Sequence, residues 1–297
     1  MIKNDFKEKI EQLFNDKILK IEALTSKVTL LSLKDNKFIV KRVNVRTKNI
    51  YDFLASQKVD VVLYPFKQFI YEKDIFFVYK YVNEYEYPSE KKISDLINVV
   101  DELHKKTGFT VRLNDLNFKY FYRIYKNLDR IFQTLEMVVR ECEERVNKTD
   151  FDWIILSKYY IYLNTKKIMY QLQRKIHKYV DNHGSVTYVL NHGNLNLNHF
   201  KQKKLVSFDN GYSGIFVSDY AKLYVALDDI DGVWFKDISE KINSYENDFY
   251  KTYFKFLVLY IYMINLRITS YEEHTIINTY VQISAKINRF LNLTSNY

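Results

Sequence analysis

The hydrophobic pattern of the chain changes near Pro88, and this change constrains the fold more than any other feature of the sequence. Before Pro88, apolar and β-branched residues gather in runs of strand length. These runs are 17–23, 28–33, 38–43, 61–63, 66–71 and 75–82. Helical spacing interrupts them at residues 5–16 and 47–57. The pattern predicts a β-rich N-terminal lobe over residues 1–83.

From residue 89 onward, apolar residues recur mainly at helical spacing, which predicts long helices at 115–146 and 151–180. The segment 183–219 breaks this pattern because it holds four of the six glycines and two short β-like runs. Loops that interrupt a rigid scaffold commonly carry function. We therefore predict a mainly helical C-terminal lobe over residues 84–297, with a functional segment at 190–221.

Composition narrows the class of protein. Cys142 is the single cysteine, so the chain has no internal disulfide and fits a reducing compartment. The most apolar stretch, 253–266, is too short to span a bilayer and contains Lys255, so we expect a buried helix there. We expect a cytoplasmic protein without a membrane span. The net charge of +9 is spread along the chain, which favours a basic surface over a nucleic-acid partner.

Three short stretches in the functional segment have a distinctive order. Residues 191–200 read Asn-His-Gly-Asn-Leu-Asn-Leu-Asn-His-Phe, 207–211 read Ser-Phe-Asp-Asn-Gly, and 218–221 read Ser-Asp-Tyr-Ala. This resembles the pattern His-Gly-Asp-x-His-x-x-Asn, then Ile-Asp-Trp/Phe, then Asp-x-Ala of aminoglycoside phosphotransferases and choline kinases. The resemblance implies an α+β, two-lobed protein-kinase-like fold with a small antiparallel β N-lobe and a larger helical C-lobe. It also implies ATP and Mg²⁺ as cofactors.

The resemblance places His192 and Asn194 in the catalytic loop. Asn194 stands where the family has the aspartate that accepts the proton of the attacking hydroxyl. An amide orients a hydroxyl but cannot take its proton, and loss of a general base costs about 10²–10⁴ in rate. Asp219 matches the aspartate that braces this loop, and it is retained.

The metal-binding positions are altered in part. Asp209 matches the family's second metal ligand, whereas His199 stands where the metal-binding asparagine is expected, one position after Asn198. Mg²⁺ prefers oxygen ligands, so Asn198 is a candidate substitute. A packed histidine at position 199 and an ordinary turn aspartate at position 209 are the alternatives.

The N-terminal lobe carries a lysine on an apolar strand face. Alternation places Lys41 on the same face as Ile39 and Val43, where burial of an unpaired charge is costly. The resemblance makes Lys41 the phosphate-binding lysine. The alternative is an edge-strand lysine whose ammonium reaches water. The family's glutamate partner is missing from helix 47–57, where Asp52 is the one acid.

The turn expected to cover the phosphates contains no glycine, because the first glycine of the chain is Gly108. Thr25 and Ser26 occupy this turn, and their hydroxyls are candidate phosphate ligands, although close backbone approach is harder without glycine.

The losses at these positions favour a degenerate phosphotransferase, a pseudokinase that acts as a binding or scaffold module and retains a nucleotide. Residues 198–200, Asn-His-Phe, also resemble the spore-coat branch of the superfamily, which implies a spore-coat location. One alternative is an active ATP- and Mg-dependent O-phosphotransferase on a small hydroxylated substrate. The other is a nucleic-acid-binding helical protein. The substrate or protein partner is left open.

Overall fold

The structure is a computed structural model that describes residues 4–81, 88–228, 232–266 and 273–295. It is a mixed α+β protein with a small antiparallel sheet and a larger helical part, which confirms the predicted fold class. The chain divides into two compact units, described separately below. The first unit comprises residues 1–107 and 192–212, and the second comprises 108–191 and 213–297. The predicted boundary between residues 83 and 84 lies outside the described residues.

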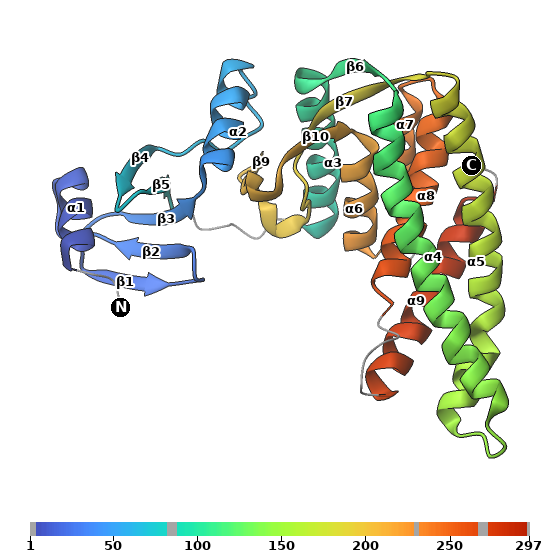
Figure 1. Ribbon diagram of the computed structural model, residues 1–297. Coiled ribbons are helices and arrows are strands. Elements are labelled where there is room, and N and C mark those ends of the chain that lie inside the picture. The colour runs from blue at the N-terminus through green and yellow to red at the C-terminus, as the bar shows by residue number, and fades with distance from the viewer. Residues whose placement is uncertain (1–3, 82–87, 229–231, 267–272, 296–297) are drawn as a thin grey trace. The chain divides into compact units, whose positions relative to one another are not determined.

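The first unit contains a five-stranded antiparallel sheet with the order β1-β2-β3-β5-β4 (Figure 1). Its strands are β1 (Lys20–Ala23), β2 (Val28–Ser32), β3 (Lys37–Val43), β4 (Lys67–Tyr71) and β5 (Asp74–Lys80). Helix α1 (Asn4–Phe14) packs on one face, where Phe6 and Ile10 join Phe38 and Val40 in a buried cluster. The predicted strand at 61–63 is wrong. Val61 and Val62 are buried and Leu63 is half-buried, but Val62 forms only an isolated bridge, with Leu205.

Strand β3 presents its alternate residues to different surroundings. Phe38 and Val40 face the α1 cluster, so Lys41 lies on the opposite face with Ile39 and Val43, as alternation predicts. Helix α2 (Val45–Ser56) covers this second face. Its Tyr51 ring contacts Phe77 at 5.2 Å, and Phe77 is the β5 register partner of Lys41.

The first unit also holds α3 (Ser89–Thr107), which ends directly before Gly108. Residues 192–212 add two 3-10 turns, η1 (Leu197–His199) and η2 (Phe208–Asn210), around the short hairpin of β8 (Phe200–Lys201) and β9 (Lys204–Leu205). The second of the two β-like runs predicted within 183–219, residues 204–208, is therefore strand only at its start. Ser207 has φ 68°, a left-handed conformation that ends the extended backbone.

The second unit is mainly helical. Its helices are α4 (Asp115–Glu144), α5 (Asp150–Asp181), α6 (Val217–Leu227), α7 (Val233–Asn243), α8 (Asp248–Ile264) and α9 (Glu273–Leu293). Helices α4 and α5, which the periodicity predicts, run side by side (Figure 1). A sheet with the order β10-β7-β6 joins β6 (Phe109–Arg112), β7 (Ser185–Asn191) and β10 (Tyr212–Ile215). Strand β6 is not predicted from the sequence. Its side chains are mostly exposed, so it lacks the buried apolar face that typically marks a strand.

Helix α8 lies in the core of the second unit, as expected for the apolar stretch 253–266. Phe254, Val258 and Met263 are fully buried. The buried Tyr162 hydroxyl of α5 donates to the Tyr280 carbonyl at 2.7 Å. Among the described residues, no helix combines the length and apolar character needed to cross a bilayer.

Helix α5 begins with a buried carboxylate. Asp152 accepts from the backbone N–H of Thr149 at 2.8 Å, the Thr149 side chain caps the helix in return, and Arg145 pairs with Asp152 at 2.9 Å. The hydrogen bond from the Thr149 backbone lowers the pKa of Asp152 below 3.8. A carboxyl with a lowered pKa stabilises the fold above its ordinary pKa, and this stabilisation is lost as pH falls through the folded-state pKa.

We therefore expect Asp152→Asn to lower the melting temperature at neutral pH, with a deficit that shrinks as the solution is made acidic. Circular dichroism melts across a pH series measure this difference. Asp150→Asn is the matched control, because Asp150 is an exposed acid in the same helical turn. A deficit of constant size at every pH contradicts the ionised role assigned to Asp152.

Candidate functional site

The structure brings together two residues that the sequence marks as functional. The Lys41 ammonium donates to Oδ2 of Asp209, 168 residues further along the chain, and to Oγ of Ser207 at 3.1 Å. Lys41 is 8% exposed, so its charge is satisfied by this ion pair rather than by water. The predicted phosphate-binding lysine and the predicted metal-binding aspartate are therefore in direct contact within the first unit.

Helix α2 contributes a tyrosine to this site instead of an acid. Asp52 pairs with Lys48 at 2.6 Å, one helical turn away. Tyr51 points inward and accepts from the backbone N–H of Ser207 at 3.3 Å. Burial raises the pKa of Tyr51, so its phenol stays neutral. Sequence reasoning missed Tyr51, although its spacing with buried Thr47 and Leu54 marks the inward face of α2.

The loop from residue 192 to 200 is held by its two histidines. His192 is buried, and its Nε2–H donates to the Val206 carbonyl at 2.7 Å. His199 donates from Nδ1 to the Asn194 carbonyl at 2.6 Å. Burial lowers the pKa of His199 below 6.5, which favours the neutral ring. His199 therefore fixes the backbone at Asn194, whose side chain is exposed.

The assignment of Asp209, His199 and Asn198 to a metal ion stays a prediction. In the described part of the chain, no group of three or more His, Cys, Asp or Glu side chains is placed to hold a metal ion. One Asp209 oxygen accepts from the Lys41 ammonium. Of the other candidates, Asn198 is exposed and His199 uses Nδ1 on the loop backbone. Mg²⁺ is commonly held by one or two carboxylates, with water and phosphate oxygens completing its octahedral geometry.

The turn between β1 and β2 is closed by a hydroxyl rather than by glycine. Thr25 Oγ1 accepts from the backbone N–H of Lys27 at 3.2 Å and from that of Val28 at 3.1 Å. Thr25 and Ser26 are both exposed. The Thr25 oxygen is therefore engaged in the turn itself, and its assignment to a phosphate stays a prediction.

A cavity of about 340 Å³ opens beside Lys41 within the first unit. Apolar side chains from the sheet, Val28 and Ile39, line it together with Val206 from the loop before Asp209. Lys80 and Lys201 also line it, and no acid is found among the described lining residues. Its volume lies in the range of small-molecule sites, and its lysines favour an anionic ligand.

Asp219, the predicted brace of the catalytic loop, lies in the second unit. It is fully buried in the first turn of α6, where its N–H donates to the Phe216 carbonyl at 3.3 Å. Its bracing role stays a prediction.

Comparison with known proteins identifies the fold. No family model matches the chain, and no curated protein has a significantly similar sequence. Among solved structures, an aminoglycoside phosphotransferase from Alicyclobacillus acidocaldarius matches with a TM-score of 0.64 at 12% identity, covering 94% of this chain and 92% of that one. A spectinomycin phosphotransferase in complex with ADP and spectinomycin matches at 0.55 and 10% identity, with 99% of both chains covered.

A microcompartment-associated aminopropanol kinase also matches, with a TM-score of 0.51 and 13% identity over 96% of this chain and 97% of that one. The fold is therefore that of the kinase-like small-molecule phosphotransferases. More particularly, the chain has the aminoglycoside phosphotransferase fold that the motifs at 191–221 predict. The similarity to the spore-coat branch is not tested by these structures and stays a prediction.

Proposed function

We propose that this protein is a nucleotide-binding pseudokinase, a kinase-fold module that binds ATP or ADP without a divalent metal and does not transfer phosphate. The contact between Lys41 and Asp209 is the observation that carries this proposal. The Lys41 ammonium pairs with the Asp209 carboxylate, which would otherwise be available to bind a metal cation. The positive charge that phosphates require is then supplied by the protein.

The cavity beside Lys41 supports the nucleotide. An ammonium has three N–H donors, and Asp209 and Ser207 use two of those on Lys41, which leaves one for a ligand phosphate. Lys80 and Lys201 add two more cations to the cavity, and its apolar walls suit a flat base. The spectinomycin phosphotransferase of the same fold has been solved with ADP and with AMP, which agrees with a nucleotide here.

The absence of transfer rests on the missing base. Asn194 cannot accept a proton, and residues 191–208 contain no Asp or Glu that could replace the lost carboxylate from within the loop. The imidazole of His199 braces the loop backbone at Asn194. A binding or scaffold role, which the similarity of residues 198–200 to the spore-coat branch also favours, fits this arrangement better than turnover does.

Turnover assays test the proposal. The purified chain is incubated with Mg·ATP and a panel of aminoglycosides, choline and aminoalcohols, and ADP release and phosphorylated product are followed. We expect no product above the level without protein, while an active spectinomycin phosphotransferase assayed in parallel forms product. Phosphorylation of any panel member that disappears in Asp209→Ala contradicts the proposal and establishes the active phosphotransferase instead.

A further inference from the structure

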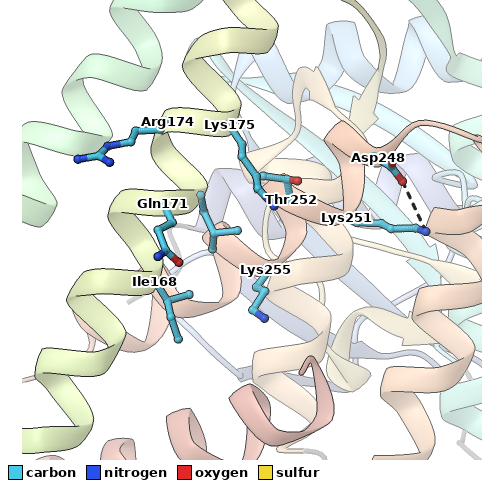
Figure 2. Close-up of a pocket in the computed structure, with 9 residues that line it drawn as sticks. Ile168, Gln171, Arg174, Lys175, Asp248, Lys251, Thr252 and Lys255 are labelled. Atoms are coloured by element: carbon cyan, nitrogen blue, oxygen red, sulfur yellow. Dashed lines mark ion pairs between the residues drawn. The ribbon is translucent and has the colours of Figure 1, made fainter. Parts of the chain in front are cut away.

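Helices α5 and α8 of the second unit enclose a cavity of about 680 Å³ that none of the roles above explains (Figure 2). Arg174 and Lys175 from α5 and Lys251 and Lys255 from α8 line it, against one described acid, Asp248. Asp248 lies 3.7 Å from Lys251 and is almost fully exposed, so it neutralises little of this charge. The cavity therefore carries a net positive charge.

The excess of cations continues beyond this cavity. An adjoining cavity of about 390 Å³ shares Lys175, Asp248 and Thr252 with it and adds Lys178 from the next turn of α5. No ion pair engages Lys175 or Lys178 within the described part of the chain. A concave surface lined by one sign of charge focuses the field and attracts counter-ions. Both cavities thus favour an anion.

Lys255 shows where the charge is least well compensated. Its ammonium donates to the Thr294 carbonyl at 2.9 Å, which is a neutral partner. Burial lowers the pKa of Lys255, and the charge of Lys175 lowers it further. Figure 2 shows Lys175 of α5 extending toward Thr252 of α8, whereas Arg174 extends away from α8. An anion between Lys175 and Lys255 would relieve the repulsion between them.

We propose that this cavity binds a small organic phosphate. The phosphate would lie between the Lys175 and Lys255 ammoniums, within reach of the Gln171 amide and the Thr252 hydroxyl. The uncharged part of the molecule would rest on Ile168 and Leu172, which form the apolar portion of the lining. The volume is within the range of sites that hold metabolites and drug-sized ligands. This site is separate from the nucleotide cavity of the first unit.

A small ligand fits this site better than a nucleic acid does. Nucleic-acid binding relies on many phosphate contacts spread along a surface. Here the cations gather around one cavity between two helices, and two of its lining residues, Ile168 and Leu172, are apolar. Such a lining suits a compact molecule with one charged end and one uncharged end.

Isothermal titration of the full chain with sodium pyrophosphate and with glucose 6-phosphate, at constant ionic strength, tests the site. We expect saturable binding that weakens about tenfold or more in Lys175→Glu and in Lys255→Met. Lys175 is exposed, so its replacement leaves the core intact. Lys167→Glu is the matched control, because Lys167 is an exposed lysine of α5 outside the cavity lining, and this variant should bind like the wild type.

The Lys41→Met variant separates this inference from the proposed nucleotide site, and it should bind glucose 6-phosphate with unchanged affinity. The absence of saturable binding at millimolar concentrations overturns the inference. Equal weakening in Lys175→Glu and Lys167→Glu also overturns it, because the effect is then one of net charge. Binding of oligonucleotides alone, with a steep salt dependence, overturns it in favour of a nucleic-acid surface.

Discussion

The Lys41→Met variant is expected to bind ATP about 10- to 100-fold more weakly than the wild-type chain, because it loses a charge-assisted hydrogen bond to phosphate. Two effects act together. The cavity loses the lysine next to Ser207, and Asp209 is left without the ammonium that neutralises it. An unpaired carboxylate beside the cavity then repels the phosphates. Methionine keeps most of the buried volume of the lysine stem, so the sheet should remain intact.

The control for this variant is Arg42→Met. Arg42 follows Lys41 on β3, lies on the other face and pairs with Asp74 at 3.2 Å in an exposed ion pair. The Arg42→Met variant removes one positive charge from the same strand, as Lys41→Met does, and should leave the affinity for ATP unchanged. Calorimetric titration of both variants in buffer containing EDTA measures the difference. Equal affinities in Lys41→Met and the wild type would show that any nucleotide binds elsewhere.

The Gly193→Ala variant is expected to lower the free energy of unfolding by about 2–4 kcal/mol, through backbone strain and overpacking. Gly193 has φ +82°, where a side chain is strained. A Cβ there would also overlap the carbonyl oxygen of Asn210, and the carbonyl carbon would lie 2.8 Å away. Backbone cannot move aside as a side chain can, so loops 192–194 and 208–210 would have to separate.

Urea denaturation measures this loss, and Asn194→Ala is the control because it changes the next residue, which is exposed. We expect Asn194→Ala to stay within about 0.5 kcal/mol of the wild type. If Gly193→Ala is as stable as the control, the close approach of Gly193 to Asn210 is wrong, and so is the loop geometry built on it.

Much of the fold follows from local patterns. Alternation along β3 places Lys41 opposite the α1 cluster, and helical spacing predicts α4 and α5 almost to their ends. The order and spacing of His192, Asp209 and Asp219 predict the kinase-like fold, because proteins of one fold place such motifs at similar intervals along the chain. These features depend on neighbours close in sequence or on a pattern carried by a whole family.

The features that the sequence does not predict depend on tertiary contacts between residues far apart in the chain. No local pattern says that Lys41 pairs with Asp209, because 168 residues separate them. Val62 looks like a strand residue, yet it meets Leu205 in a single bridge. The cations around Lys175 and Lys255 belong to two distant helices and look like ordinary surface charge until α5 and α8 are brought together. Sequence reasoning therefore finds the candidate residues but not the contacts that change their roles.

The affinity for ATP with and without magnesium tests the central claim most directly. Calorimetric titration of the wild-type chain is carried out once with excess EDTA and once with millimolar Mg²⁺. Because Lys41 neutralises Asp209 and lysines line the cavity, we expect saturable ATP binding with the same affinity in both conditions, within about twofold. Binding that appears only with Mg²⁺, and that Asp209→Ala abolishes, would contradict the account and show that Asp209 holds a metal ion.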